Sequence, residues 1–164
     1  MKKILIIGSN SFAGSDFVDY LLTKNFKVYG VSRNKEINNE YLRYKKNKKI
    51  RNFQFHKINL NLNKDLDRLI KLIRKHKLEY IVNFAAQGMV AESWINPEDW
   101  YFTNVVSNSI MIRKLSKLKI KKYLNFSTPE VYGSTPSLIR ESNVFAPTTP
   151  YAVSRSAQDL NLLA

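Results

Sequence analysis

Apolar residues recur along this chain with two spacings, and the two spacings alternate. Short apolar or alternating runs predict strands over residues 4–7, 27–32, 53–58, 80–84 and 121–127. Between these runs, apolar residues repeat every three or four positions, which is typical of amphipathic helices. Strands that alternate with helices favour a parallel sheet with helices on both faces. We therefore expect an α/β fold, a doubly wound parallel sheet with strand order 3-2-1-4-5.

Capping residues mark the starts of three of the expected helices. Asn63 is expected to cap a helix with acidic residues in its first turn, which suits the helix dipole. Asn96 is followed by proline and predicts a long helix over residues 97–118. Thr149, also followed by proline, starts a last helix that runs to the end of the chain.

The first strand and the turn after it carry the strongest chemical signal. Residues 4–7 are all isoleucine or leucine, as expected for a strand buried on both faces. Gly8 ends this run, and an amphipathic segment with Gly14 near its start follows at once. A strand, a glycine turn and a helix bind the pyrophosphate of a dinucleotide on the free N–H groups of the helix. Gly8 should allow the tight turn, and Gly14 should let the helix pack closely on the strand. Ser11 stands where another glycine is usual.

Composition and charge narrow the classes of function. The chain has 164 residues, no cysteine and a net charge of +14. Without cysteine, thiolate catalysis and cysteine-ligated zinc are excluded, and the two histidines show no metal-site pattern. Because the positive residues are spread along the chain, we expect anionic nucleotides rather than nucleic acid as partners. The run over residues 4–7 is too short for a signal peptide or a membrane span, so we expect a cytoplasmic protein without membrane contact.

Five stretches form a series along the chain. They are the turn with Gly8, Ser11, Phe12 and Gly14, then NFAAQ at 83–87, Thr103-Asn104, STPEVYG at 127–133, and the pair Tyr151 and Arg155. This series resembles the extended short-chain dehydrogenases/reductases that act on nucleotide sugars, which have GxxGFxG, NLAAQ, TN, STxEVYG and YxxxK in this order. Among them, the pattern is closest to the GDP-mannose 4,6-dehydratases, which also lack an acid at the position of Pro129.

The resemblance implies catalytic roles for Thr128, Glu130, Tyr151 and Arg155. Tyr151 would take the proton of a sugar hydroxyl that Thr128 also contacts, and the positive charge of Arg155 would favour the phenolate. Arg155 replaces the family's lysine, which also holds the nicotinamide ribose, and cannot relay a proton. Glu130 matches the base that removes the carbon-5 proton in 4,6-dehydratases. The alternatives are that Tyr151 and Arg155 form an ordinary side-chain pair on a helix, and that Glu130 is an acid on a surface loop.

The same resemblance implies cofactor contacts beyond the glycine turn. Ala85, Ala86 and Gln87 would line the cofactor after the fourth strand, and Asn59 stands where the family often has aspartate beside the adenine. Arg33 follows the second strand, where NAD-binding members carry an acid. A basic residue there suits a 2′-phosphate, which favours NADP, with NAD as the alternative. Arg33 could instead be one more exposed arginine of a basic chain.

The sequence therefore predicts a Rossmann-type NAD(P)-binding domain over residues 1–164 that is truncated before the substrate domain. We expect it to belong to a nucleotide-sugar 4,6-dehydratase that forms a homodimer at full length, and to be inactive alone. A nucleotide-sugar 4-epimerase or reductase is the first alternative. A degenerate dinucleotide-binding protein without catalysis is the second, and nucleic-acid binding is the third.

Overall fold

The computed structural model describes residues 1–38 and 40–164. These residues pack as two compact units. Unit 1 contains Met1–Ala85 and Lys114–Phe126, and unit 2 contains Ala86–Arg113 and Ser127–Ala164. The glycine turn therefore lies in unit 1, and the residues expected to be catalytic lie in unit 2.

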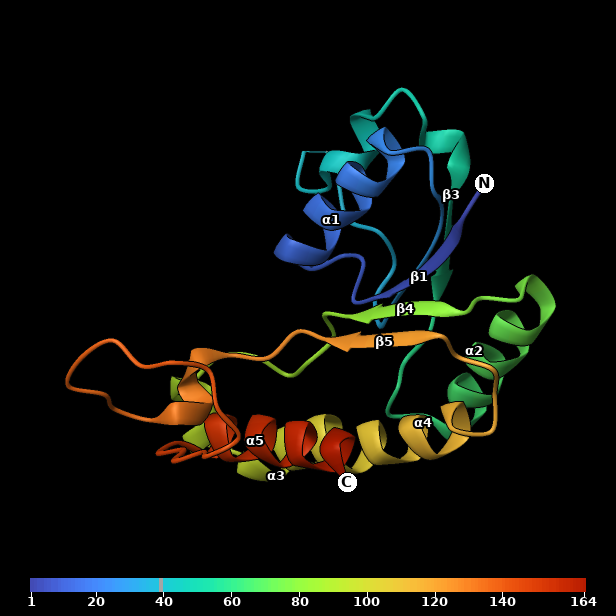
Figure 1. Cartoon of the computed structure of the whole chain (residues 1–164). Helices are drawn as coiled ribbons and strands as arrows, with labels where there is room; N and C mark the ends of the chain where they lie inside the picture. Colours follow the sequence, from blue (N-terminus) through green and yellow to red (C-terminus); the bar gives the residue numbers. More distant parts are fainter. Residues whose placement is uncertain (39) are drawn as a thin grey trace. The chain divides into compact units, whose positions relative to one another are not determined.

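Unit 1 is built on a parallel sheet of five strands. The strands are β1 (Lys3–Ile7), β2 (Lys27–Ser32), β3 (Phe53–Lys57), β4 (Tyr80–Asn83) and β5 (Lys122–Asn125). Their order is β3-β2-β1-β4-β5, and all neighbours are parallel, which confirms the predicted fold class and strand order (Figure 1). The four apolar residues of β1 are buried because the strand is central in the sheet.

Helices α1 (Phe12–Thr23) and α2 (Asn63–His76) cover opposite faces of this sheet (Figure 1). On the α1 face, Val18 and Leu22 pack into a core cluster with residues of β1 and β2. Leu42 and Tyr44 complete that cluster from the connection between β2 and β3, which also contains 3-10 turns at Arg43–Lys46 and Ile50–Asn52. The connection between β2 and β3 thus contributes two fully buried side chains to the core.

The start of α2 differs from the prediction. Leu62, not Asn63, is the N-cap residue, and no side chain caps the helix there. Asp65 instead accepts a hydrogen bond from the backbone N–H of Asn59 (2.8 Å) and pairs with Arg68 (2.9 Å). These contacts, the Asn59 amide first, hold the pKa of Asp65 below its ordinary value. Asp65, the acid in the first turn of α2, therefore binds the backbone of the loop before the helix.

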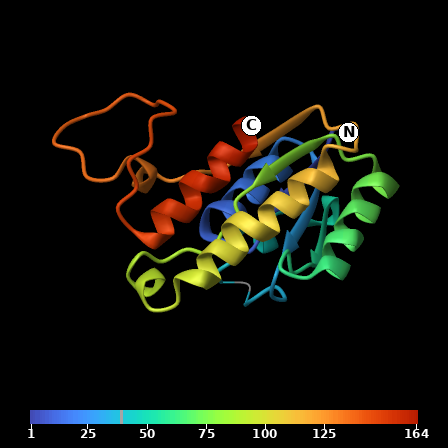
Figure 2. The ribbon, with the colours of Figure 1, turned by 90° about the horizontal axis from the view of Figure 1, so that it is seen from below.

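Unit 2 contains α5 (Pro150–Leu163), which lies alongside the helical run that begins with α3 (Pro97–Trp100) (Figure 2). That run widens into a π-helical segment at Tyr101–Ser107 and continues as α4 (Asn108–Leu115). The expected uniform helix over residues 97–118 is therefore interrupted, and it ends at Leu115. Two 3-10 turns, Ala91–Trp94 and Pro129–Tyr132, complete the unit.

No helix in the described part of the chain has both the length and the apolar character needed to cross a membrane.

Candidate active site

The turn after β1 leaves no room for side chains at its two glycines. Gly8 has a φ of +84°, and a Cβ there would lie 2.7 Å from the backbone nitrogen of Ala85. A Cβ at Gly14 would lie 2.2 Å from the carbonyl oxygen of Gly8. The turn therefore needs glycine at both positions, at the first for conformation and at both for space.

Ser11 closes this turn with its side chain. It is the N-cap residue of α1, and its Oγ accepts a hydrogen bond from the N–H of Gly14 (3.0 Å). The same hydroxyl donates to the carbonyl of Gly8 (2.8 Å). The N–H groups of Phe12 and Ala13 make no hydrogen bond within residues 1–38 and 40–164, so the first turn of α1 keeps two donors for an anion. Phe12 is 86% exposed at the same turn and does not join the apolar face of α1.

The loop after β2 is tied to the glycine turn by Asn10, a residue that the sequence patterns did not single out. The backbone N–H of Asn10 donates to Ser32 Oγ (3.0 Å), and its Nδ2 donates to the carbonyls of Asn34 (3.3 Å) and Lys35 (3.1 Å). Arg33 lies within this tied segment and is exposed. The structure thus brings Arg33 to the loop that follows β2, beside the glycine turn.

The carboxyl ends of the next strands are also held by asparagines. Asn59 is half-buried after β3, and its side-chain oxygen accepts the N–H of Asn61 (3.1 Å). Asn83, at the end of β4, donates to Asn125 Oδ1 of β5 (3.0 Å) and accepts the N–H of Ala85 (3.0 Å). The buried Asn83 therefore fixes the backbone where the NFAAQ segment begins.

In unit 2, a buried network joins Gln87 to α5. Asn104 accepts the N–H of Gln87 (2.8 Å) and donates to the carbonyl of Gln87 (3.0 Å) and to Ser154 Oγ (2.9 Å). Ser154 donates in turn to the carbonyl of Tyr151 (2.7 Å). Because Ser93 Oγ also accepts the N–H of Tyr151 (3.1 Å), the first turn of α5 is fixed from two sides. The sequence pointed to Asn104 through the TN pair but not to the two serines.

The segment with Thr128 and Glu130 is anchored to the same helix. Thr128 starts the 3-10 turn at Pro129–Tyr132, and its side chain accepts the N–H of Glu130 (3.4 Å). Ser127, directly before it, donates to the carboxylate of Asp159 on α5. Both Thr128 and Glu130 are half-buried. A carboxylate and a hydroxyl therefore stand on a segment that contacts the helix carrying Tyr151.

Tyr151 and Arg155 lie on one face of α5, one turn apart. Tyr151 is half-buried, and Arg155 is only 5% exposed. Arg155 is therefore not a surface charge. A permanent cation in a buried position is suited to stabilising an anion such as a phenolate.

Comparison with known proteins identifies the family. A family model described as GDP-mannose 4,6 dehydratase matches residues 5–163. The chain belongs to this family. The GDP-mannose 4,6-dehydratase of Yersinia enterocolitica is 30% identical over 166 residues, which are 94% of this chain and 43% of that protein. The dTDP-D-glucose 4,6-dehydratase of Dictyostelium discoideum is 29% identical over 178 residues, which are 97% of this chain and 39% of that protein.

Two solved structures of 4-epimerases have the same fold as this chain. The UDP-Glc/GlcNAc 4-epimerase of Campylobacter jejuni is similar with a TM-score of 0.86 and 25% identity, over 99% of this chain and 48% of that one. The UDP-glucose 4-epimerase of Bifidobacterium longum, solved with NAD+ and UDP, has a TM-score of 0.86 at 21% identity and shows the shared fold. The predicted resemblance to extended short-chain dehydrogenases/reductases is confirmed. The chain spans less than half the length of these relatives.

Proposed function

We propose that this chain is the cofactor-binding part of a nucleotide-sugar 4,6-dehydratase. The observation that carries the proposal is the anchoring of the Thr128–Glu130 segment to α5, the helix that presents Tyr151 and the buried Arg155. This anchoring supports assigning a base for carbon 5 and a base for a hydroxyl to connected elements of one unit. The match of the family over residues 5–163 supports the same assignment.

The residues of unit 1 fit a nicotinamide dinucleotide. Gly8 and Gly14 are positions that a Cβ would fill, and the first turn of α1 keeps two N–H donors for a pyrophosphate. Asn59 and Ala85 are further unit 1 residues that we assign to the cofactor. In unit 2 we assign Ala86, Gln87, Tyr151 and Arg155 to it. When bound, the nicotinamide supplies the hydride chemistry that dehydration needs.

Tyr151 acts as the base that takes the proton of the carbon-4 hydroxyl. The buried positive charge of Arg155 stabilises the phenolate, and Thr128 donates a hydrogen bond to the same sugar oxygen. Glu130 removes the proton at carbon 5, which the adjacent ketone has made acidic. Because Pro129 has no proton to donate, Glu130 also protonates the hydroxyl that leaves from carbon 6 as water.

We assign NADP rather than NAD as the cofactor because Arg33 follows β2 and is exposed in the loop beside the glycine turn. A guanidinium there pairs with a 2′-phosphate on the adenosine ribose. The Arg33→Ala variant should therefore weaken NADP binding and leave NAD binding unchanged. Equal losses for both dinucleotides would contradict this assignment.

A nucleotide-sugar 4-epimerase is the second candidate, because the structurally similar protein from Campylobacter jejuni is a 4-epimerase. Glu130 favours the dehydratase, since 4-epimerisation needs no base at carbon 5. The homodimer and the cytoplasmic location remain predictions for the protein at full length. Alone, the chain should bind the dinucleotide without turnover, because the relatives are more than twice as long.

The reaction can be tested in a chimera in which residues 1–164 replace the matching segment of the Yersinia enterocolitica relative. We expect the chimera to convert GDP-mannose into a product lighter by one water, detected by mass spectrometry, and the Tyr151→Phe chimera to form none. A chimera that binds NADP but yields only an epimer of equal mass would favour the 4-epimerase. A chimera that binds NADP and forms neither product would contradict the enzymatic assignment.

A further inference from the structure

Asn10 connects the two loops of unit 1 that meet at the carboxyl ends of β1 and β2. Its three donated hydrogen bonds reach Ser32, Asn34 and Lys35, which lie on both sides of Arg33. Its side-chain oxygen lies 3.4 Å from the hydroxyl of Tyr44. The half-buried side chain of Asn10 therefore restrains the residues after Arg33, and its backbone N–H restrains Ser32 before it.

The acid in the same segment, Glu36, is held by two further side chains. Tyr44, fully buried, donates its hydroxyl to Glu36 (2.9 Å), and Lys45 lies 4.0 Å from the same carboxylate oxygen. Burial, and then Glu36, raise the pKa of Tyr44 above its ordinary value, so the hydroxyl stays a donor. Lys45 also donates to the carbonyl of Ile37 (3.1 Å). The carboxylate is thus compensated, which lowers its repulsion of a nearby phosphate.

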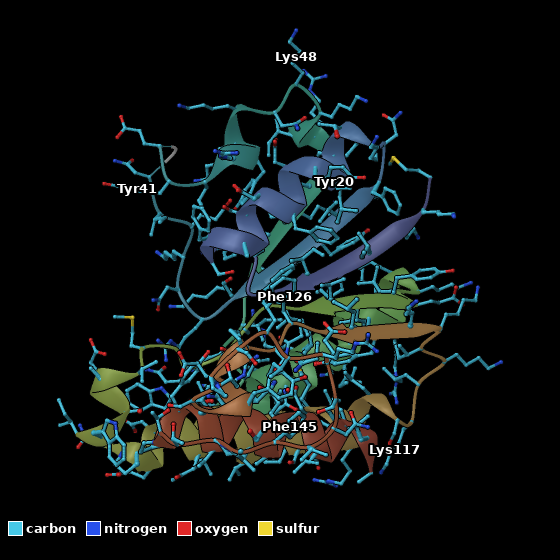
Figure 3. All side chains as sticks on the ribbon, turned by 60° about the vertical axis from the view of Figure 1, so that its left-hand side comes forward. Tyr20, Tyr41, Lys48, Lys117, Phe126 and Phe145 are labelled. Carbon is cyan, nitrogen blue, oxygen red and sulfur yellow. The ribbon has the colours of Figure 1, made fainter. Side chains whose placement is uncertain are left out.

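Later residues of this connection are held by contacts with α1: Arg43 pairs with Asp16 (3.3 Å), and Asn47 donates to Asp19 (2.7 Å). Tyr41 is 70% exposed and Lys48 is exposed, and Figure 3 shows both side chains pointing outward. Residues 34–37, next to Arg33, are thus held by Asn10, Tyr44 and Lys45.

We propose that Asn10 is a positioning residue for cofactor choice: by fixing the loop after β2 to the glycine turn, it holds Arg33 where a phosphate on the adenosine 2′ position can be bound. This inference rests on the proposed binding of NADP. A loop that is already ordered loses less conformational freedom when it binds a ligand, so the restraint strengthens binding of the 2′-phosphate. The pyrophosphate is bound by the amides of α1 and does not depend on this loop.

The test measures binding by the 164-residue chain with calorimetry, using NADP, NAD, adenosine 2′,5′-bisphosphate and AMP as probes. Asn10→Ala should weaken NADP and the bisphosphate on the order of tenfold, because about one to two hydrogen bonds that order the loop are lost. NAD and AMP should change by less than about twofold. Asn63→Ala, an exposed asparagine at the start of α2, is the matched control and should change nothing.

A double variant shows whether Asn10 acts through Arg33. If it does, Asn10→Ala combined with Arg33→Ala should weaken NADP no more than Arg33→Ala alone. Tyr44→Phe keeps the ring packing on Phe53 but removes the donor to Glu36, and should also weaken NADP selectively, which covers the case that Asn10→Ala fails to fold. Equal losses of NADP and NAD in Asn10→Ala, or additive losses in the double variant, would overturn this inference alone. Failure of the unmodified chain to bind either dinucleotide would overturn the proposed function as well.

Discussion

Replacing Gly14 with alanine tests how closely α1 packs on the turn after β1. The added Cβ would lie 2.2 Å from the Gly8 carbonyl oxygen and 2.7 Å from Ser11 Oγ. The first distance is about 1 Å shorter than ordinary van der Waals contact. The Gly8 oxygen cannot move alone, since it belongs to the backbone and accepts hydrogen bonds from both the N–H and the hydroxyl of Ser11.

The expected cost follows from these contacts. Overpacking costs about 1–3 kcal/mol, and disturbing the Ser11 cap adds about 1 kcal/mol. The higher helix propensity of alanine offsets about 1 kcal/mol of this. We therefore expect Gly14→Ala to lower the free energy of unfolding by about 1–3 kcal/mol and the melting temperature by roughly 2–4 °C per kcal/mol.

Urea unfolding followed by circular dichroism measures this effect. Gly88→Ala is the matched control, because a Cβ at Gly88 would meet no atom within 4 Å. Its unfolding midpoint should equal that of the unmodified chain. A Gly14→Ala variant with the same midpoint as the Gly88→Ala control would refute the close packing of this turn.

Three further predictions concern the Ser11 cap of α1, the pH dependence of stability, and Glu130 as the base at carbon 5. Ser11→Ala should lower the free energy of unfolding by about 1 kcal/mol, and Ser11→Gly by roughly a few tenths; equal urea midpoints for the two variants would show that the Oγ contacts are not stabilising. Stability should fall below about pH 6.5, because burial and then the charges of neighbouring lysines lower the pKa of His76, so the folded chain binds fewer protons than the unfolded one. Urea midpoints that stay constant from about pH 7.5 to about pH 5 would contradict this. In the chimera, Glu130→Gln should slow dehydration by about a hundredfold or more, whereas Glu141→Gln, an exposed acid of the same loop, should not; equal rates for the two variants would remove the main support for a dehydratase.

The sheet could be predicted from the sequence because its signals are local. Residues 4–7 are continuously apolar, and strands alternate with recognisable helices or turns, which is typical of a doubly wound parallel sheet with this strand order. The glycine turn could be predicted for the same reason. Gly8 needs its positive φ, and a Cβ at Gly14 would meet Gly8 and Ser11, so these requirements lie within a few residues of each other.

Other features depend on contacts that are distant in the sequence. Asn10 reaches Ser32 only because β1 and β2 pair in a register that sets Ile7 beside Val31. The start of α2 was predicted wrongly because the capping rule is local, whereas Asp65 is engaged by the loop before the helix. Likewise, helical spacing places Arg155 on the same face of the last helix as Tyr151. The spacing does not show that Arg155 is buried by other elements.

The measurement that tests the central claim most directly is a titration of the 164-residue chain with NADP, followed by NMR spectra of the backbone amides. Binding at the glycine turn should shift the amides of Gly8–Gly14 most, since they include the donors of the first turn of α1, and the amides of Arg33 and Ala85 should follow. NAD should shift the glycine turn and leave Arg33 nearly unchanged. An absence of shifts, or shifts confined to the basic stretch at residues 45–51, would contradict a dinucleotide site at this turn.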